Sequence, residues 1–383
     1  MRSTFLNALA GLVLACAMVA CGGGQSGTNP TPTPTPTPTP APTPTPTPLA
    51  AGIYQFAKSP DSFTQSDGSG KLCAINTATE TTFNAATNIA VDPAGRLFTN
   101  TTWLNRVVVT GFSTFTSICG SISSESSSPL QTSNVDFLQS NLAFAKNGKL
   151  VASTVNVGPS GLTNVVAEID PTLPGIFLKY PEKLLERQFV IAADGTFYSS
   201  DGFILRKTTP SGVSTILAGA PYDPNVPAMA LDGTGPAARF GGVIAIAVSP
   251  QGDIYVADKG IAIRKISSAG VVSTIAGSLT DKGALDGPGS SAKFSYVNSI
   301  VVDSAGSIFA ADGGNHAIRK ITPQGVVSTV AGKLGTSGYS LGNLPGLLNG
   351  PQGLAIDGSD LLYLIVSTTL NSQPAVEILK IKL

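Results

Sequence analysis

The stretch from Leu231 to Gly332 alternates short apolar runs with short polar turns, and it does so twice in the same order. Each copy holds four runs rich in Val, Ile and Ala, of about the 5–6 residues usual for a β-strand. Gly, Pro, Asp and Asn dominate between the runs, and these residues favour tight turns. In the second copy the four runs are SIVVD (299–303), SIFAAD (307–312), HAIRKI (316–321) and VVSTVAG (326–332). Each copy is therefore predicted to form a four-stranded antiparallel sheet.

The distance between the two copies is constant. Four pairs of positions are each 54 residues apart, namely Asp232 and Asp286, Phe240 and Phe294, Gly252 and Gly306, and Asp258 and Asp312. A repeat of this length is typical of solenoids, propellers and arrays. The turn between the first and second strands recurs along the chain, at Gly252 and Gly306 in these two copies and, outside them, at Gly95, Gly148, Gly195 and, with aspartate in place of glycine, Asp360.

Six units of four strands fit a closed β-propeller, because ring closure leaves only short and protected sheet edges. An open stack would need capping repeats at both ends, and the sequence contains no segment of that kind. We therefore predict an all-β, six-bladed β-propeller with four-stranded antiparallel blades. The last unit, 354–383, supplies only three strands, so we expect an N-terminal strand to complete it. KLCAIN (71–76) is the first candidate, and IYQF (53–56) is the alternative.

Three motifs carry a resemblance to a known family. They are YVAD followed by IRKI, the element DG-x-G-x-x-A-[RK]-F, and the run DGGNHAIRKITPQGVVSTVAG (312–332). On these motifs the unit resembles the NHL repeat of bacterial propeller proteins, clearly over about 212–332 and more weakly over 88–212. The resemblance implies a six-bladed propeller but no single activity, because this fold hosts binding proteins and several kinds of enzyme.

The first 50 residues predict a targeting segment and a linker. Residues 1–21 combine a positive start, an apolar stretch and small residues before Cys21. MVAC followed by GGGQSG resembles a bacterial lipoprotein signal with Cys21 as the lipidated residue; VLAC (13–16) and a plain secretory signal are the alternatives. We expect a lipid-anchored protein of the bacterial cell envelope, on its periplasmic side or on the cell surface.

Residues 22–50 are glycine-rich and then alternate Thr with Pro. Proline fixes φ and removes the amide donor, so this segment favours polyproline II. At ~3.1 Å per residue, the run 30–48 reaches on the order of 60 Å. We predict a tether that holds the propeller domain, 51–383, away from a membrane.

Charge and cysteine content bound the partners. Lys and Arg number 23, and Asp and Glu also number 23, so no basic face for nucleic acid is indicated. We expect a monomer whose partner is a protein or a glycan of the envelope.

Cys73 and Cys119 are predicted on the outermost strands of the last and first blades. In an oxidising compartment they either form a disulfide that closes the ring or remain two thiols.

The turn after the second strand and the link to the next blade share one face of a propeller. This face also carries the two longest insertions, 220–235 and 332–350, and loops usually carry function. We therefore predict ligand contacts at six residues there: Asp232, Asp258, Asp286, Asp312, Asn315 and His316. The competing interpretation is structural. The aspartates then cap backbone amides, His316 is part of the fold, and Phe240 and Phe294 pack between blades. Three arginines that recur in the third strand, Arg206, Arg264 and Arg319, then either form hydrogen bonds between blades or are exposed.

Elimination narrows the chemistry. A single histidine excludes a multi-histidine zinc site, and a Ser-His-Asp triad would rest on His316 without a nucleophile elbow. The expected ring at the channel mouth has no carboxylate for calcium; it contains Asn88, Asn141, Gln188, Ala245, Ser299 and Gly353. We predict a non-catalytic binding or scaffolding module without catalytic residues, metal or cofactor. The alternative is a lactonase-like hydrolase or lyase, calcium-dependent or not, acting on a sugar or peptide.

Overall fold

The chain separates into two compact units, Met1–Pro48 and Leu49–Leu383. The computed structural model describes residues of the second unit, over 50–58, 88–92, 97–101, 106–111, 114–118, 122–124, 135–136, 142–144, 148–158, 161–169, 176–178, 188–225, 229–370 and 373–383. Cys21, Cys73, Cys119 and nearly all of the expected signal and tether lie outside these ranges, so the proposals about them stay predictions. None of the described residues belongs to a helix that is long and apolar enough to span a membrane.

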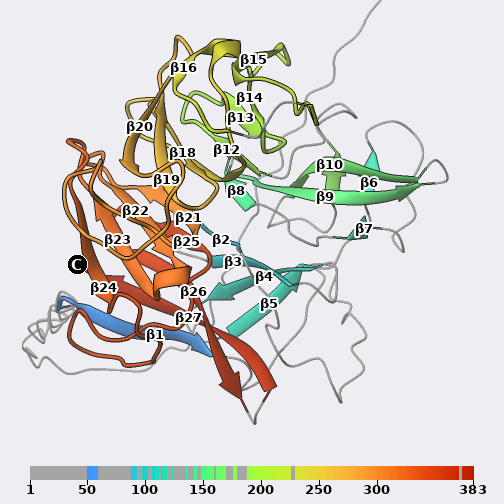
Figure 1. Cartoon of the computed structure of the whole chain (residues 1–383). Helices are drawn as coiled ribbons and strands as arrows, with labels where there is room; N and C mark the ends of the chain where they lie inside the picture. The colour runs from blue at the N-terminus through green and yellow to red at the C-terminus, as the bar shows by residue number, and fades with distance from the viewer. Residues whose placement is uncertain are drawn as a thin grey trace, which may run out of the picture. The chain divides into compact units, whose positions relative to one another are not determined.

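The described residues form strands, turns and two three-residue 3-10 turns, η2 (Gly235–Ala237) and η3 (Gly313–Asn315), with no α-helix among them. The strands make six sheets (Figure 1). The first sheet contains β2 (Ile89–Val91), β3 (Leu97–Thr101), β4 (Arg106–Gly111) and β5 (Thr114–Ile118). The second contains β6 (Ile122–Ser124), β7 (Val135–Asp136), β8 (Leu142–Phe144), β9 (Leu150–Gly158), β10 (Gly161–Ile169) and β11 (Ile176–Leu178). The third contains β12 (Gln188–Ile191), β13 (Phe197–Ser200), β14 (Ile204–Thr208) and β15 (Ser214–Gly219).

The two copies of the repeat, 231–277 and 285–332, form the next two sheets. The fourth sheet contains β16 (Gly233–Thr234), β17 (Val243–Val248), β18 (Ile254–Asp258), β19 (Ala262–Ile266) and β20 (Val271–Gly277). The fifth contains β21 (Val297–Val302), β22 (Ile308–Asp312), β23 (Ala317–Ile321) and β24 (Val327–Gly332), which confirms the four strands predicted there. The second sheet departs from the prediction, since β6 joins its edge by parallel pairing with β11.

The innermost strands of the six sheets contact one another in a closed cycle. β2 contacts β8, β8 contacts β12, β12 contacts β17, β17 contacts β21, and β25 (Leu354–Ile356) contacts both β21 and β2. Residues from all six strands line one central cavity of about 260 Å³. This arrangement is the β-propeller predicted from the repeat.

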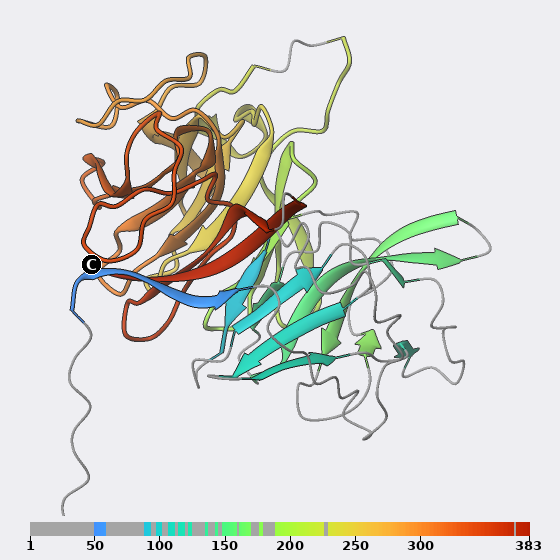
Figure 2. The same cartoon turned by 90° about the horizontal axis from the view of Figure 1, so that it is seen from below.

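An N-terminal strand completes the last sheet. β1 (Gly52–Lys58) pairs antiparallel with β27 (Gln373–Lys382), which in turn pairs with β26 (Leu362–Leu370) (Figure 2). The predicted closure is therefore confirmed, but its assignment to 71–76 is wrong, and the alternative at 53–56 is right.

Ile53 explains why this segment closes the sheet. Its side chain is buried against Leu379 and Ile381. Its backbone N–H donates to the Gly342 carbonyl at 2.7 Å, and its carbonyl accepts from the Gly342 N–H at 2.8 Å. The strand is thus bonded to β27 on one side and, at Ile53, to the 333–350 loop on the other.

Phenylalanine fills the space between adjacent sheets. Phe240 packs in one cluster with Leu205 and Ala218 of the third sheet and Val256 of the fourth. Phe294 occupies the equivalent place between the fourth and fifth sheets. The sequence-based interpretation of both residues is therefore confirmed. β18 and β22 are buried at every position, because neighbouring sheets cover both faces.

Glycine ends the outer strand of the repeat for a steric reason. Gly277 has φ +85°, and a Cβ atom there would collide with the Ile261 carbonyl oxygen and lie 2.9 Å from Phe294 Cδ2 and 3.0 Å from Ala262 Cα. Gly252 has nearly the same φ, +87°, but open space around the place of a Cβ. The two positions therefore share the left-handed backbone and differ in crowding.

We expect Gly277→Ala to destabilise the protein more than Gly252→Ala. Both variants incur the left-handed cost of about 1–2 kcal/mol. Only Gly277→Ala also pushes against the Ile261 carbonyl and the Phe294 ring, which adds the ~1–3 kcal/mol typical of overpacking. Urea unfolding of both variants measures the difference, and equal losses would show that the crowding around Gly277 adds no cost.

Candidate ligand-binding pocket on the loop face

The predicted site residues of the first copy assemble around one buried arginine. Arg264 donates to Asp258 Oδ2 at 2.7 Å and to Asp232 Oδ1 at 2.9 Å. The same guanidinium donates to the backbone carbonyls of Leu231 and Arg239, and it lies over the Phe240 ring. The Arg264 and Asp258 side chains are fully buried, whereas the Asp232 side chain is 44% exposed.

The second copy repeats this network. Arg319 donates to Asp312 Oδ2 at 3.0 Å and to Asp286 Oδ1 at 2.6 Å, and it lies over the Phe294 ring. Asn315 adds a bond, since its Nδ2 donates to Asp312 Oδ2 at 2.7 Å. Both arginines therefore hold two carboxylates, as expected for side chains that bond elements of the fold together.

The buried aspartates also hold the backbone of the links between sheets. Asp258 Oδ1 accepts from the N–H groups of Gly241 and Gly242, both at 2.9 Å. Asp312 Oδ1 accepts from the equivalent N–H groups of Ser295 and Tyr296, at 3.1 and 3.2 Å. This is the amide-capping role of the structural interpretation. Direct contact between a ligand and any of the six residues stays a prediction.

Hydrogen bonds also connect the second insertion, 332–350, to His316 and to the last sheet. His316 lies in the left-handed region with φ +56°, and its Nδ1 accepts from the Gly350 N–H at 3.1 Å. Tyr339, within the insertion 332–350, is bonded to the buried Glu377. Burial, and then this carboxylate, raise the pKa of Tyr339 above its ordinary range. The insertion is thereby held against the last sheet.

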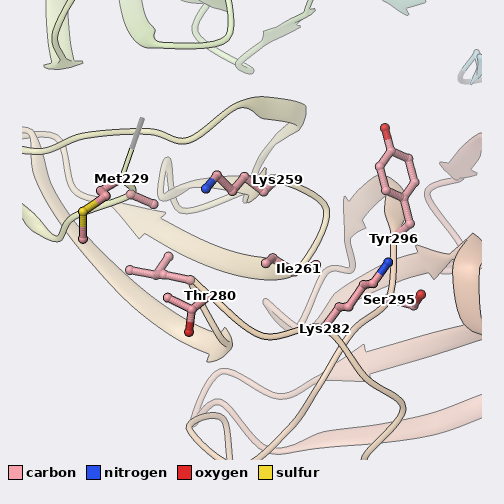
Figure 3. A pocket seen from close by; sticks show the side chains of 9 residues that line it. Met229, Lys259, Ile261, Thr280, Lys282, Ser295 and Tyr296 are labelled. Carbon is pink, nitrogen blue, oxygen red and sulfur yellow. The ribbon is translucent and has the colours of Figure 1, made fainter. Parts of the chain in front are cut away.

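A pocket of about 540 Å³ opens beside the β18–β19 turn (Figure 3). We call it the loop-face pocket. This volume falls within the ~300–1,000 Å³ range of small-molecule sites. The lining comes from three separate segments, namely the link before β16, the β18–β19 turn and the link between β20 and β21. It consists of Met229, Ala230, Lys259, Ile261, Leu279, Thr280, Lys282, Ser295 and Tyr296.

The side chains that give this pocket its chemistry do not recur in the repeat. Lys259 follows Asp258, whereas Gly313 follows the equivalent Asp312. Ser295 and Tyr296 stand where the first copy has Gly241 and Gly242. Recurring positions identify the framework, and the residues that line the pocket are not among them. Departures from the repeat on this face were the signal that could have found it.

Lys259 has an uncommon backbone conformation for a residue with a side chain, with φ +54°. Its N–H donates to the Gly242 carbonyl at 2.7 Å. A Cβ on Gly241 would lie 2.9 Å from Lys259 Cγ and 2.8 Å from Cδ. Gly241 therefore leaves room for the aliphatic part of Lys259, which lies across it before the amine reaches the pocket.

The lining is positively charged. Lys259 and Lys282 are exposed, and neither forms an ion pair within the described part of the chain. The neighbouring carboxylate, Asp281, pairs with Lys293 at 3.5 Å. No carboxylate is among the lining residues that the structure describes. Among the same described ranges, no group of three or more His, Cys, Asp or Glu is arranged to hold a metal ion.

The central cavity offers different chemistry. Four residues of the ring expected at the channel mouth line it, namely Asn88, Gln188, Ala245 and Ser299. Asn141 lies outside the described residues, and at the sixth position the lining contains Leu354 rather than Gly353. Ser299 Oγ accepts from the Leu354 N–H at 3.1 Å. Much of the lining is apolar, and calcium binding there stays an untested alternative to the predicted absence of a metal.

No family model and no curated protein matches this sequence. Solved structures do match it. One is a protein of unknown function from Bacteroides thetaiotaomicron VPI-5482, with a TM-score of 0.59 and 16% identity over 86% of this chain and 75% of that one. Auxiliary nutrient binding proteins match from Bacteroides ovatus ATCC 8483 (TM-score 0.57, 16% identity, 86% and 76% covered) and from B. thetaiotaomicron VPI-5482 (0.56, 16%, 87% and 76%). These likenesses support the fold.

Proposed function

We propose that this chain is a non-catalytic ligand-binding protein of the bacterial cell envelope, built on an NHL-type propeller and anchored through a lipid on Cys21. The ligand binds in the loop-face pocket. The observation that carries the proposal is that framework residues recur in the repeat, whereas the pocket-lining Lys259, Ser295 and Tyr296 do not. Two of the similar structures are auxiliary nutrient binding proteins, which supports a binding role.

The loop-face pocket is a better binding site than the central cavity for two reasons. Its volume is about 540 Å³, against about 260 Å³ for the cavity. Its lining also combines apolar side chains with hydroxyl and ammonium groups, and a few placed polar groups are what orient a ligand in a mostly apolar site.

A probe panel tests the proposal on the full chain purified in a neutral detergent. The panel contains neutral oligosaccharides, acidic sugars and amino acids, and binding is measured by calorimetry and by the melting temperature. A ligand at 100 times its dissociation constant stabilises the native state by about 2.7 kcal/mol. We expect one class to bind the wild type and not Thr280→Trp, whose indole fills the pocket.

Ser268→Trp is the matched control, because Ser268 is an exposed residue of the β19–β20 turn, away from the pocket. Binding that survives Thr280→Trp, or a panel in which nothing binds, would contradict the proposal. Conversion of a bound probe to a product, detected by mass spectrometry with calcium and with chelator, would favour the hydrolase or lyase alternative.

The lipid anchor has its own test. We expect Cys21→Ser to move the protein from the membrane fraction to the soluble fraction, because the acylated residue is lost. Cys16→Ser should leave it in the membrane fraction. Fractionation of cells followed by immunoblotting measures both. Release by Cys16→Ser alone would place the lipid at the VLAC site, and retention of both variants in the membrane fraction would remove the anchor from the proposal.

A further inference from the structure

We infer that the ligand of the loop-face pocket is an acidic oligosaccharide, with carboxylates carried on separate sugar rings. This inference rests on the proposed binding function and names the class of ligand. Its first support is the charge of the lining, which presents two ammonium groups that no described carboxylate neutralises. A concave site lined by one sign of charge concentrates ligands of the opposite sign.

The two ammonium groups lie on different sides of the pocket. Figure 3 shows the Lys259 amine extending toward Met229, while the Lys282 amine points toward the side that carries Ser295 and Tyr296. Lysine acts as a point charge rather than as a fork for one planar anion. This separation favours a ligand with two spaced carboxylates over a single phosphate.

The position of Lys259 is built into the backbone. Left-handed conformations of residues with a side chain cost on the order of 1–3 kcal/mol and concentrate at functional sites. Here that conformation, together with the space above Gly241, directs the amine into the pocket. Asp258 supports the arrangement, because it holds the N–H groups of Gly241 and Gly242.

The uncharged lining suits sugar rings. Tyr296 is 47% exposed, and its backbone is held by Asp312. An exposed aromatic ring offers an apolar face with a polar tip, which complements the C–H face and the hydroxyl groups of a sugar. The hydroxyl of Ser295 beside it and that of Thr280 on the Met229 side of the pocket add donors and acceptors (Figure 3).

The test uses three probes of similar length on the full chain in neutral detergent. They are trigalacturonate, the neutral trisaccharide maltotriose, and the acidic peptide triglutamate. We expect calorimetry to detect trigalacturonate binding that weakens as salt is added, because exposed charges are screened. We expect Lys259→Gln and Lys282→Gln each to weaken binding about tenfold, the size of one lost charge-assisted hydrogen bond.

Two further variants refine the test. Gly241→Ala retains every charge but displaces the Lys259 side chain, so we expect it to weaken trigalacturonate binding as well. Lys333→Gln removes an exposed lysine outside the pocket and should leave the affinity unchanged. Melting temperatures check that each variant is folded.

The outcomes separate this inference from the proposed function. Equal binding of maltotriose and trigalacturonate, insensitive to both lysine variants but abolished by Thr280→Trp, would overturn the acidic ligand and leave the binding function standing. Lysine-dependent binding of triglutamate without trigalacturonate would replace the oligosaccharide by an acidic peptide. If no probe binds here while the wider panel yields a pocket ligand, only this inference is overturned. If that panel fails as well, the proposed function is also overturned.

Discussion

Arg264→Ala is expected to destabilise the protein by about 3–5 kcal/mol, the cost of removing one partner from a buried ion pair. The Asp258 carboxylate would remain fully buried without its cation. The carbonyls of Leu231 and Arg239 would each lose a charged donor as well. The free energy of unfolding in urea measures the effect.

Lys265→Ala is the matched control, because Lys265 is the next residue on the same strand. Its ion pair with Asp253 has a similar N–O distance, 2.6 Å, but both side chains are more than one third exposed. Exposed pairs contribute about 0–1 kcal/mol. We therefore expect a much smaller loss. Arg319→Ala repeats the experiment in the second copy, and losses comparable to that of Lys265→Ala would contradict a structural role for the two networks.

Deletion of residues 49–58 is expected to unfold the propeller, so that it shows no cooperative thermal transition, and to cause aggregation. The deletion removes β1 and exposes the edge of β27 to other chains, which is the usual origin of edge-to-edge association. It also removes Ile53, and burial of such a side chain is worth about 1.5–3 kcal/mol. Circular dichroism and size-exclusion chromatography measure the two effects.

Deletion of residues 22–48 is the control for shortening the chain, because these residues belong to the other compact unit. We expect it to leave the melting temperature unchanged. A synthetic peptide of residues 50–58 should restore part of the stability of the first deletion variant. An unaltered melt without β1 would show that the closing strand is dispensable.

The sequence by itself determined the repeating part of this protein. Local patterns predict the strand positions, the tight turns and the inter-sheet phenylalanines. These patterns recur after 54 residues, so the second copy supports the assignment made for the first. The need for an N-terminal closing strand followed from the same count. The sequence favoured 71–76 over 53–56 as the closing strand, and this assignment was wrong. Both segments are short and apolar enough for an outer strand, so the local pattern alone does not distinguish them.

Tertiary structure decided the remaining features. Ile53 closes the last sheet because it packs against Leu379 and Ile381 and bonds to Gly342. These partners are distant in the sequence, so only the tertiary structure brings them together. The recurring aspartates belong to the framework, because Arg264 and Arg319 form ion pairs with them. The repeat pattern does not predict the pocket, because the side chains that line it come from separate segments and do not recur. Repetition encodes the scaffold through local physics, whereas a binding site is created where distant, unrepeated residues meet.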